Sequence, residues 1–116
     1  MSARSIRGKV AIAGVGESTY YKHGQSPDAE FVLALQAIVR AAEDAGINPQ
    51  DIDGFASYSN DRSDPSRIGA ALGIPDLRFS NMQFGGGGGG VAAAVANGAA
   101  AVANGYADCV VVFRAL

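Results

Sequence analysis

The residues best suited to chemistry are six consecutive glycines, Gly85 to Gly90, which separate Asn81-Met-Gln-Phe84 from a stretch of Ala, Val and Gly. Glycine has no Cβ, so such a run lets the backbone approach a ligand closely. The stretch that follows predicts a helix, whose start presents unpaired N–H groups and a dipole that favours negative charge. We therefore expect a substrate-binding loop formed by the backbone of Gly86, Gly87, Gly88 and Gly89. A flexible linker, or glycine present only for close packing, explains the same run, and the pattern by itself does not separate these interpretations.

Three other groups that could do chemistry have simpler explanations. His23 has no second metal-type ligand at a useful spacing, so we expect a solvated loop residue. Cys109 lies in an apolar stretch, where a cysteine is more often an inert small hydrophobe than a nucleophile. The Asp residues between Asn60 and Asp64 lack the spacing of a calcium loop and are interpreted as turn and capping residues. These patterns identify no catalytic residue and no metal site.

A short glycine motif, Gly14-Val-Gly16 followed by Thr19, matches part of a dinucleotide-binding fingerprint. The fingerprint needs its glycines to open a helix directly. Here the polar stretch from Glu17 to Ser26 intervenes before any helix. We therefore expect no nucleotide site at this motif and no resident cofactor.

Four apolar runs alternate with three helix signals along the chain. Strands are expected at Lys9 to Val15, at Phe55 to Ser59, at Leu77 to Gln83 and from about Cys109 to Val112. Helices are expected from the N-cap Ser26 to Gly46, from the N-cap Asp64 to Gly73, and from about Gly89 to Asn104. The order β-α-β-α-β-α-β predicts an α/β fold with a mainly parallel sheet and right-handed crossovers. The third helix carries no charge, so we expect it to be buried on every side between layers.

Composition excludes several classes of protein. The 116 residues are 48% hydrophobic and 17% charged with a net charge of −2, a profile that fits one globular domain. The weak acidity leaves no electrostatic footprint for nucleic acid, and no Lys/Arg cluster points to a membrane surface. The single cysteine fits a reducing compartment, and we expect a cytoplasmic protein. No apolar run is long enough to span a membrane, and the start does not have the pattern of a secretory signal.

The ends of the chain predict an incomplete domain. Residues 1–8 are expected to form a flexible arm, and residues 9–116 to form one domain. The chain stops at Arg114-Ala115-Leu116, directly after an apolar strand, although a buried parallel strand needs cover on both faces. We therefore expect the domain to be truncated.

Three segments resemble the N-terminal part of the thiolase superfamily. They are residues 42–53, the helix after the glycine-rich turn, and Asn104-Gly-Tyr-Ala-Asp-Cys-Val-Val-Val112. Residues 14–21 and 81–90 are most similar to the branch of lipid-transfer proteins, or sterol-carrier-protein-type thiolases, which includes the steroid side-chain aldolases. The resemblance runs from about Lys9 over nearly the whole chain.

The resemblance implies a five-layer αβαβα subunit built from two similar halves. Each half has a mixed five-stranded sheet, and this chain would supply four strands and three helices of the first half. The family is usually dimeric, so we expect a homodimer, with a small OB-fold/zinc-ribbon subunit as a further partner. The substrate implied is a CoA thioester.

One feature departs from the thiolase pattern. Thiolases carry a nucleophilic cysteine at the start of the central helix, where the dipole lowers the pKa of a thiol. Counting back from Gly105 places that position near Gly88, and counting from Asn81 places it near Phe84. Neither is Cys or Ser, so no acyl-enzyme can form through this loop, and the remaining acid/base residues of the family lie in the part that this chain lacks.

The favoured function is therefore carbon–carbon bond cleavage of the retro-aldol type on a lipid or steroid acyl-CoA. That reaction needs a base for the hydroxyl proton and a site that stabilises an enolate, but no acyl transfer to the protein. The alternatives are a non-catalytic lipid or acyl-CoA carrier, an inactive structural fragment, and an acyltransferase relative by fold only. We expect the 116-residue chain by itself to be inactive, with exposed apolar surface that promotes association.

Overall fold

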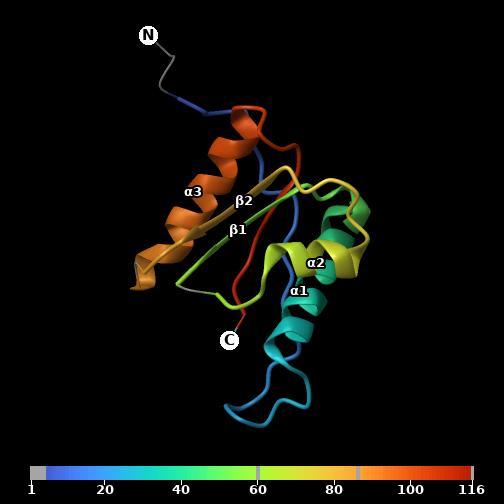
Figure 1. Ribbon diagram of the computed structural model, residues 1–116. Coiled ribbons are helices and arrows are strands. Elements are labelled where there is room, and N and C mark those ends of the chain that lie inside the picture. The colour runs from blue at the N-terminus through green and yellow to red at the C-terminus, as the bar shows by residue number, and fades with distance from the viewer. Residues whose placement is uncertain (1–4, 60, 86, 116) are drawn as a thin grey trace.

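Three parallel strands form the sheet at the centre of this computed structural model, which describes residues 5–59, 61–85 and 87–115 (Figure 1). The strands are β1 (Gly54–Tyr58), β2 (Phe79–Gln83) and β3 (Val110–Val112), in the spatial order β2-β1-β3. In this register Phe55 is opposite Ser80 on one side and Val111 on the other. Because the strands are parallel, their carboxyl ends lie along one edge of the sheet, where ligands bind in open α/β sheets.

The hydrophobic core lies around the central strand. Phe55 and Ala56 of β1 have no exposed surface, as expected for a parallel strand covered on both faces. The rings of Phe55 and Phe113 meet edge to face, with their centroids 6.0 Å apart. The largest fully buried side chains are Phe55, Ile38, Ile52 and Ile68.

Helices cover the sheet from two sides (Figure 1). On one side lie α1 (Glu30–Ala45) and α2 (Pro65–Leu72), which contribute Ile38 and Ile68 to the core. On the other side lies α3 (Gly90–Ala103). A Cβ at Gly98 would lie 3.2 Å from the side chains of Val110 and Val112, so α3 packs very closely on β3. Two short 3-10 helices, η2 (Pro49–Asp51) and η3 (Gly87–Gly89), complete the described elements.

Much of the predicted fold is confirmed. The sheet is parallel and the class is α/β. The C-terminal glycines Gly46 and Gly73 have the left-handed φ values of 71° and 72° that end α1 and α2. The carboxylate of Asp64 accepts a hydrogen bond from the Ser66 N–H at 2.9 Å and so caps α2, as its position before Pro65 predicted.

The predicted start of the first helix is wrong by three residues. The Ser26 hydroxyl accepts from the Asp28 N–H at 3.1 Å and donates to the Asp28 carbonyl at 2.8 Å, so it closes a turn of its own. The helix starts afterwards, at Glu30, and its N-cap residue is Ala29. Alanine cannot cap, so the first turn of α1 receives no hydrogen bond from a capping side chain.

The predicted strand from Lys9 to Val15 is not a strand in the structure. Among the described residues, no backbone hydrogen bond joins this segment to the sheet, and Ile12 and Val15 are 79% and 72% exposed. A parallel strand needs a neighbour whose N–H and C=O groups complete the ladder, and an apolar run cannot supply that neighbour by itself. The predicted order therefore loses its first strand, and three strands of the expected four are present in the described ranges.

The segment that follows Lys9 docks on α1 instead. The Val15 N–H donates to the Asp44 carboxylate at 2.9 Å, and the Arg40 guanidinium donates to the Glu17 carbonyl at 2.9 Å. Arg40 and Asp44 are both exposed, so these bonds lie on the solvated face of the helix. Gly16 touches the α1 backbone, which explains why this position has no side chain.

Among the described residues the third helix is not buried on every side, and its exposed apolar surface agrees with the expectation for the chain by itself. Gly90, Ala94, Gly98 and Ala101 are buried, and they share the face that meets the sheet. Val91 and Val95 are 46% and 38% exposed. This uncharged helix therefore has one face that packs on the sheet and further apolar surface that is exposed.

Three smaller points complete the comparison. The last strand begins at Val110, so Cys109 precedes it. Residues 1–4 of the predicted arm, residues 1–8, lie outside the described residues. Among the helices that the structure describes, none has the length and apolar character needed to cross a membrane.

Candidate functional site

The glycine loop lies at the carboxyl edge of the sheet, between the end of β2 and the start of α3 (Figure 1). Gly85 has a φ of 69°, η3 follows, and α3 begins at Gly90 with Gly89 as an N-cap that supplies no side-chain bond. The first N–H groups of such a turn have no partner within the helix. Of the four predicted site glycines, Gly87, Gly88 and Gly89 form this turn, while Gly86 lies outside the described residues.

The run of glycines has two structural roles. A Cβ at Gly88 or Gly89 would meet no atom within 4 Å, so both positions face open space. A Cβ at Gly90 would lie 2.7 Å from Cδ2 and 3.2 Å from Cβ of Tyr58. Close packing therefore explains Gly90 but does not explain Gly88 and Gly89, whose backbone is open to a ligand. Phe84, the other candidate for the nucleophile position, is 75% exposed.

Ser59 joins the end of β1 to the glycine loop. Its N–H donates to the Gln83 carbonyl at 2.9 Å, and its hydroxyl donates to the Gly85 carbonyl at 3.3 Å. Ser59 has a φ of 55°, in the left-handed region that non-glycine residues rarely occupy. Strained backbone of this kind is concentrated at functional sites. The contacts hold the two carboxyl strand ends together beneath the loop.

A buried ion pair supports the same edge. The Asp61 side chain has no exposed surface, and its Oδ2 lies 3.2 Å from the Arg114 guanidinium, which is 20% exposed. The same oxygen accepts the Ala115 N–H at 2.8 Å, and Oδ1 accepts the Ser63 N–H at 2.7 Å. Arg114 also donates to the Ser59 carbonyl at 3.2 Å. The Asp61 carboxylate therefore connects the segment after β3 to the loop after β1.

This network reaches the start of α3 through an aromatic ring. The Arg114 guanidinium lies 5.8 Å from the centroid of the Tyr58 ring, and that ring packs on Gly90. The position of the glycine loop therefore depends on the chain Asp61–Arg114–Tyr58–Gly90. Asp61 pairs with Arg114 at this edge, beside the start of α3, where the helix dipole favours negative charge.

Sequence reasoning missed most of this network. Asp61 was expected to serve in a turn, and its bond to the Ser63 N–H confirms that role, but the ion pair joins residues 53 positions apart. Arg114 and Ser59 were not singled out. Arg114 follows an apolar strand directly, and this position could have signalled the network. The carboxyl ends of parallel strands meet at one edge of the sheet, so charged residues just after such strands can come together.

Cys109 lies at the other end of the sheet, before β3 begins. Its N–H donates to the Asp53 carboxylate at 2.9 Å, and its carbonyl accepts from the Asp53 and Gly54 N–H groups. Burial raises the pKa of the Cys109 thiol above its ordinary value, and the carboxylates of Asp53 and Asp51 raise it further. A thiol with a raised pKa is a poor nucleophile, which agrees with the prediction of an inert cysteine.

We expect Cys109 to react slowly with iodoacetamide. A raised pKa leaves less thiolate at a given pH, so at pH 8 alkylation should be slower than for a cysteine in an unstructured peptide. Urea should restore the peptide rate. The raised pKa of the folded thiol also links stability to pH. The free energy of unfolding should fall as pH rises above the pKa of the unfolded thiol, because only the unfolded chain then ionises easily. Mass spectrometry over a pH series measures the rate, and a folded rate equal to the unfolded one would contradict the prediction.

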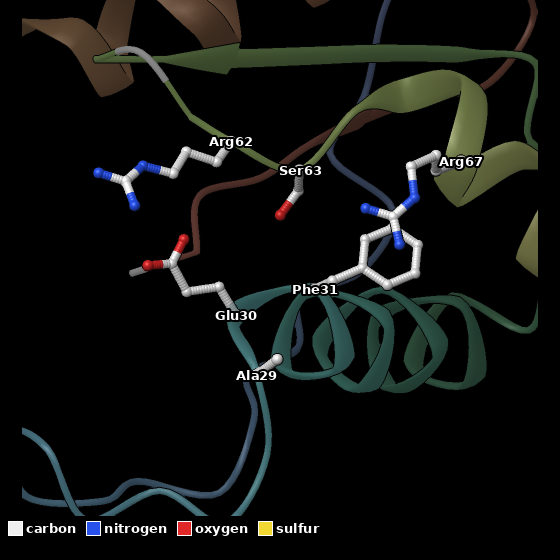
Figure 2. Close-up of a pocket in the computed structure, with 6 residues that line it drawn as sticks. All are labelled: Ala29, Glu30, Phe31, Arg62, Ser63 and Arg67. Carbon is white, nitrogen blue, oxygen red and sulfur yellow. The ribbon is translucent and has the colours of Figure 1, made fainter.

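The remaining predicted groups stay apart. His23 is exposed in its loop, in agreement with the expectation. Across residues 5–59, 61–85 and 87–115, no cluster of three or more metal-type ligands occurs. A cavity lies away from the glycine loop, at the start of α1, and is lined by Ala29, Glu30, Phe31, Arg62, Ser63 and Arg67 (Figure 2).

Comparison with known proteins supports the predicted kinship. A 17-hydroxy-3-oxo-4-pregnene-20-carboxyl-CoA lyase of Mycobacterium tuberculosis is 38% identical over 111 residues, which are 95% of this chain and 28% of that protein. A steroid side-chain-cleaving aldolase of Thermomonospora curvata is also 38% identical over 111 residues, or 95% of this chain and 27% of the relative. The chain therefore spans little more than a quarter of the length of these relatives. No family model matches it.

Solved structures give the same result for the fold. An Ltp2-ChsH2(DUF35) aldolase superposes with a TM-score of 0.83 at 38% identity, over 91% of this chain and 27% of that one. The 3-oxoacyl-[acyl-carrier-protein] synthase III of Aquifex aeolicus superposes with a TM-score of 0.61 at 17% identity, over 75% and 29% of the two chains. A priming β-ketosynthase from the R1128 polyketide pathway gives 0.62 at 19% identity, over 83% and 38%. At 17% and 19% identity, the last two superpositions show a shared fold and carry no information about function.

Proposed function

From the homology of this chain with steroid side-chain aldolases and from its thiolase-like fold, we propose that it is part of an enzyme that cleaves a β-hydroxyacyl-CoA by a retro-aldol reaction. The observation that carries the proposal is the open backbone of Gly88 and Gly89 at the start of α3, on an edge where the chain offers no cysteine. The substrate class is a lipid or steroid CoA thioester, by analogy with the relatives.

The proposed reaction divides into three steps. A base removes the proton of the β-hydroxyl group, the bond between Cα and Cβ breaks, and the hydroxyl carbon becomes a ketone. The electron pair of the broken bond moves to Cα and is delocalised onto the thioester oxygen as an enolate. Protonation at Cα then gives the shorter acyl-CoA. The sequence balances without a redox cofactor and without acyl transfer to the protein.

The contribution of this chain is stabilisation of the enolate. Developing negative charge on the thioester oxygen is favoured by preorganised N–H donors and by the positive end of a helix dipole. In this proposal the N–H groups of Gly87 and Gly88, which belong to the turn before α3, supply both. No side chain covers Gly88, so a bulky acyl group can reach this backbone. By analogy with the relatives, of whose length this chain spans 27–28%, the proposal assigns the base to a further part of the intact protein.

The proposal includes assembly. The name of the solved aldolase joins two components, Ltp2 and ChsH2(DUF35). By analogy, the intact protein would act together with a small second subunit, and as a homodimer. The open face of α3, which includes Val91 and Val95, is apolar surface that further protein would cover.

The test uses the intact protein that contains this chain, with and without such a second subunit. Incubation with a panel of β-hydroxyacyl-CoA thioesters should release a shorter acyl-CoA and a ketone. Gly88→Pro removes one N–H from the loop and should lower kcat about 100-fold, the usual effect of losing an oxyanion donor. Gly88→Ala keeps the N–H, and its methyl group meets no atom within 4 Å, so it is the matched control.

The outcomes distinguish the candidate functions. If the proline and alanine variants have equal kcat and circular dichroism shows an intact fold, the Gly88 N–H does not stabilise the enolate. Saturable binding of the thioesters without any turnover would instead indicate a non-catalytic acyl-CoA carrier. Transfer of the acyl group to free CoA would indicate an acyltransferase.

A further inference from the structure

A cavity of about 360 Å³ opens where α1 begins (Figure 2). Its walls come from three elements that are distant in the sequence: the first turn of α1, the loop before α2, and α2 itself. It is separate from the glycine loop, and the chemistry proposed above does not use it.

The first donors belong to the backbone of α1. This helix has 16 residues, and Ala29 at its N-cap supplies no side-chain acceptor. The N–H groups of the first turn are therefore not capped, and the helix dipole places partial positive charge at this end. Ala29, Glu30 and Phe31, which form this end, line the cavity.

The second donor is a buried hydroxyl group. Ser63 is only 4% exposed, and its Oγ has no hydrogen-bond partner among the described residues. Figure 2 shows this hydroxyl pointing into the space between Glu30 and Phe31. A buried hydroxyl without a partner is unfavourable, and an acceptor bound beside it would satisfy the hydroxyl. That acceptor would occupy the cavity, beside the helix start.

Two arginines complete the set. The Arg67 guanidinium lies 4.3 Å above the centroid of the Phe31 ring, which holds its donors at the cavity wall. Arg62 lies on the other side of Ser63 and faces the Glu30 carboxylate in Figure 2. Glu30 forms no ion pair within 4.0 Å among the described residues, and with two arginines against one carboxylate the lining has a net charge of +1.

We propose that this cavity binds the phosphate group of a small molecule through Ser63, Arg67, Arg62 and the first N–H groups of α1. The donors approach from different elements and directions, which suits the tetrahedral oxygens of a phosphate better than the planar pair of a carboxylate. Guanidinium groups and uncapped helix starts are both common phosphate ligands in proteins. The inference is independent of the retro-aldol proposal.

The test titrates the intact protein with inorganic phosphate at constant ionic strength, followed by isothermal calorimetry. Saturable binding is expected. Arg67→Gln should weaken it about tenfold, since a charge-assisted hydrogen bond is lost. Ser63→Ala should weaken binding as well, although it removes an unsatisfied buried hydroxyl and should not destabilise the fold. Arg78→Gln, at the opposite edge of the sheet and 56% exposed, is the matched control and should bind like the parent.

A second arm identifies the source of the phosphate. If coenzyme A competes with inorganic phosphate and dephospho-coenzyme A competes less well, the group is the 3′-phosphate of a CoA ligand. If neither competes, the site takes free phosphate or another phosphorylated molecule. The proposal is overturned if no saturable binding occurs, or if folded Arg67→Gln and Ser63→Ala proteins bind phosphate as well as the control does.

Discussion

Replacing Asp61 by alanine should destabilise the intact protein by about 3–5 kcal/mol, the usual cost of leaving a buried charge without its partner. The Asp61 side chain is completely buried, and Arg114 beside it is 20% exposed. The substitution also leaves the Ala115 and Ser63 N–H groups without their acceptor. Equilibrium unfolding in urea measures the effect, which should appear as a lower midpoint at an unchanged slope.

A second ion pair in the chain is the control. Arg78 and Asp108 lie 3.9 Å apart, and their side chains are 56% and 88% exposed. Exposed pairs contribute about 0–1 kcal/mol, so Asp108→Ala should have little effect. Asp61→Asn, which keeps an acceptor but loses the charge, should fall between the two. If Asp61→Ala costs no more than Asp108→Ala, the buried pair does not hold the carboxyl edge of the sheet together.

The same substitution should disturb the glycine loop. Without Asp61, Arg114 loses the partner that holds it over the Tyr58 ring, and Tyr58 is the surface on which Gly90 packs. We therefore expect faster amide hydrogen exchange in the first turn of α3 for Asp61→Ala. Such a change confined to the start of α3 would link the ion pair to the site.

Replacing Gly16 by alanine should have the second largest effect, a loss of about 3 kcal/mol, at the upper end of the usual cost of overpacking. The new Cβ would lie 2.3 Å from the Ala41 nitrogen and 2.6 Å from the Ala37 carbonyl oxygen. Both are backbone atoms of α1, so no side-chain rotation can relieve the contact. Either the segment leaves the helix or the helix is displaced.

Gly88→Ala is the matched control for this substitution, because its Cβ meets no atom within 4 Å. It should change stability by no more than about 0.5 kcal/mol. Amide exchange at Val15, whose N–H donates to Asp44, distinguishes the two responses to Gly16→Ala. Rapid exchange there with a modest loss of stability would mean that the segment detaches. Equal stability of the two variants would contradict the close packing of Gly16 on α1.

Local signals in the sequence predicted the elements well. The Asp64-Pro65 start and the Gly73 end of α2 are correct because capping and left-handed C-terminal glycines depend on only a few neighbouring residues. The start of the first helix was missed because Ser26 can close a turn on Asp28 as well as cap a helix. Both are local hydrogen bonds, and the residue type does not distinguish them.

The candidate site could be predicted only in part. Six glycines before an apolar helix identified the loop, and the structure places it at the carboxyl edge of the sheet. The different roles of Gly88 and Gly90 could not be seen, because they depend on where the Tyr58 ring lies. The cavity at α1 was invisible for a similar reason, since an uncapped helix start and an unpartnered Ser63 hydroxyl are apparent only in the folded chain.

The sequence by itself determined the α/β class, the strand–helix order from residue 54 onward, and the kinship with steroid side-chain aldolases. These depend on hydrophobic periodicity, on caps and on residue identity, which are all local properties of a chain. Only the tertiary structure decided that Lys9 to Val15 is not paired in the sheet and that Asp61 reaches Arg114. Strand pairing and buried charge pairs need a partner far along the chain, and no local pattern specifies which partner will be there.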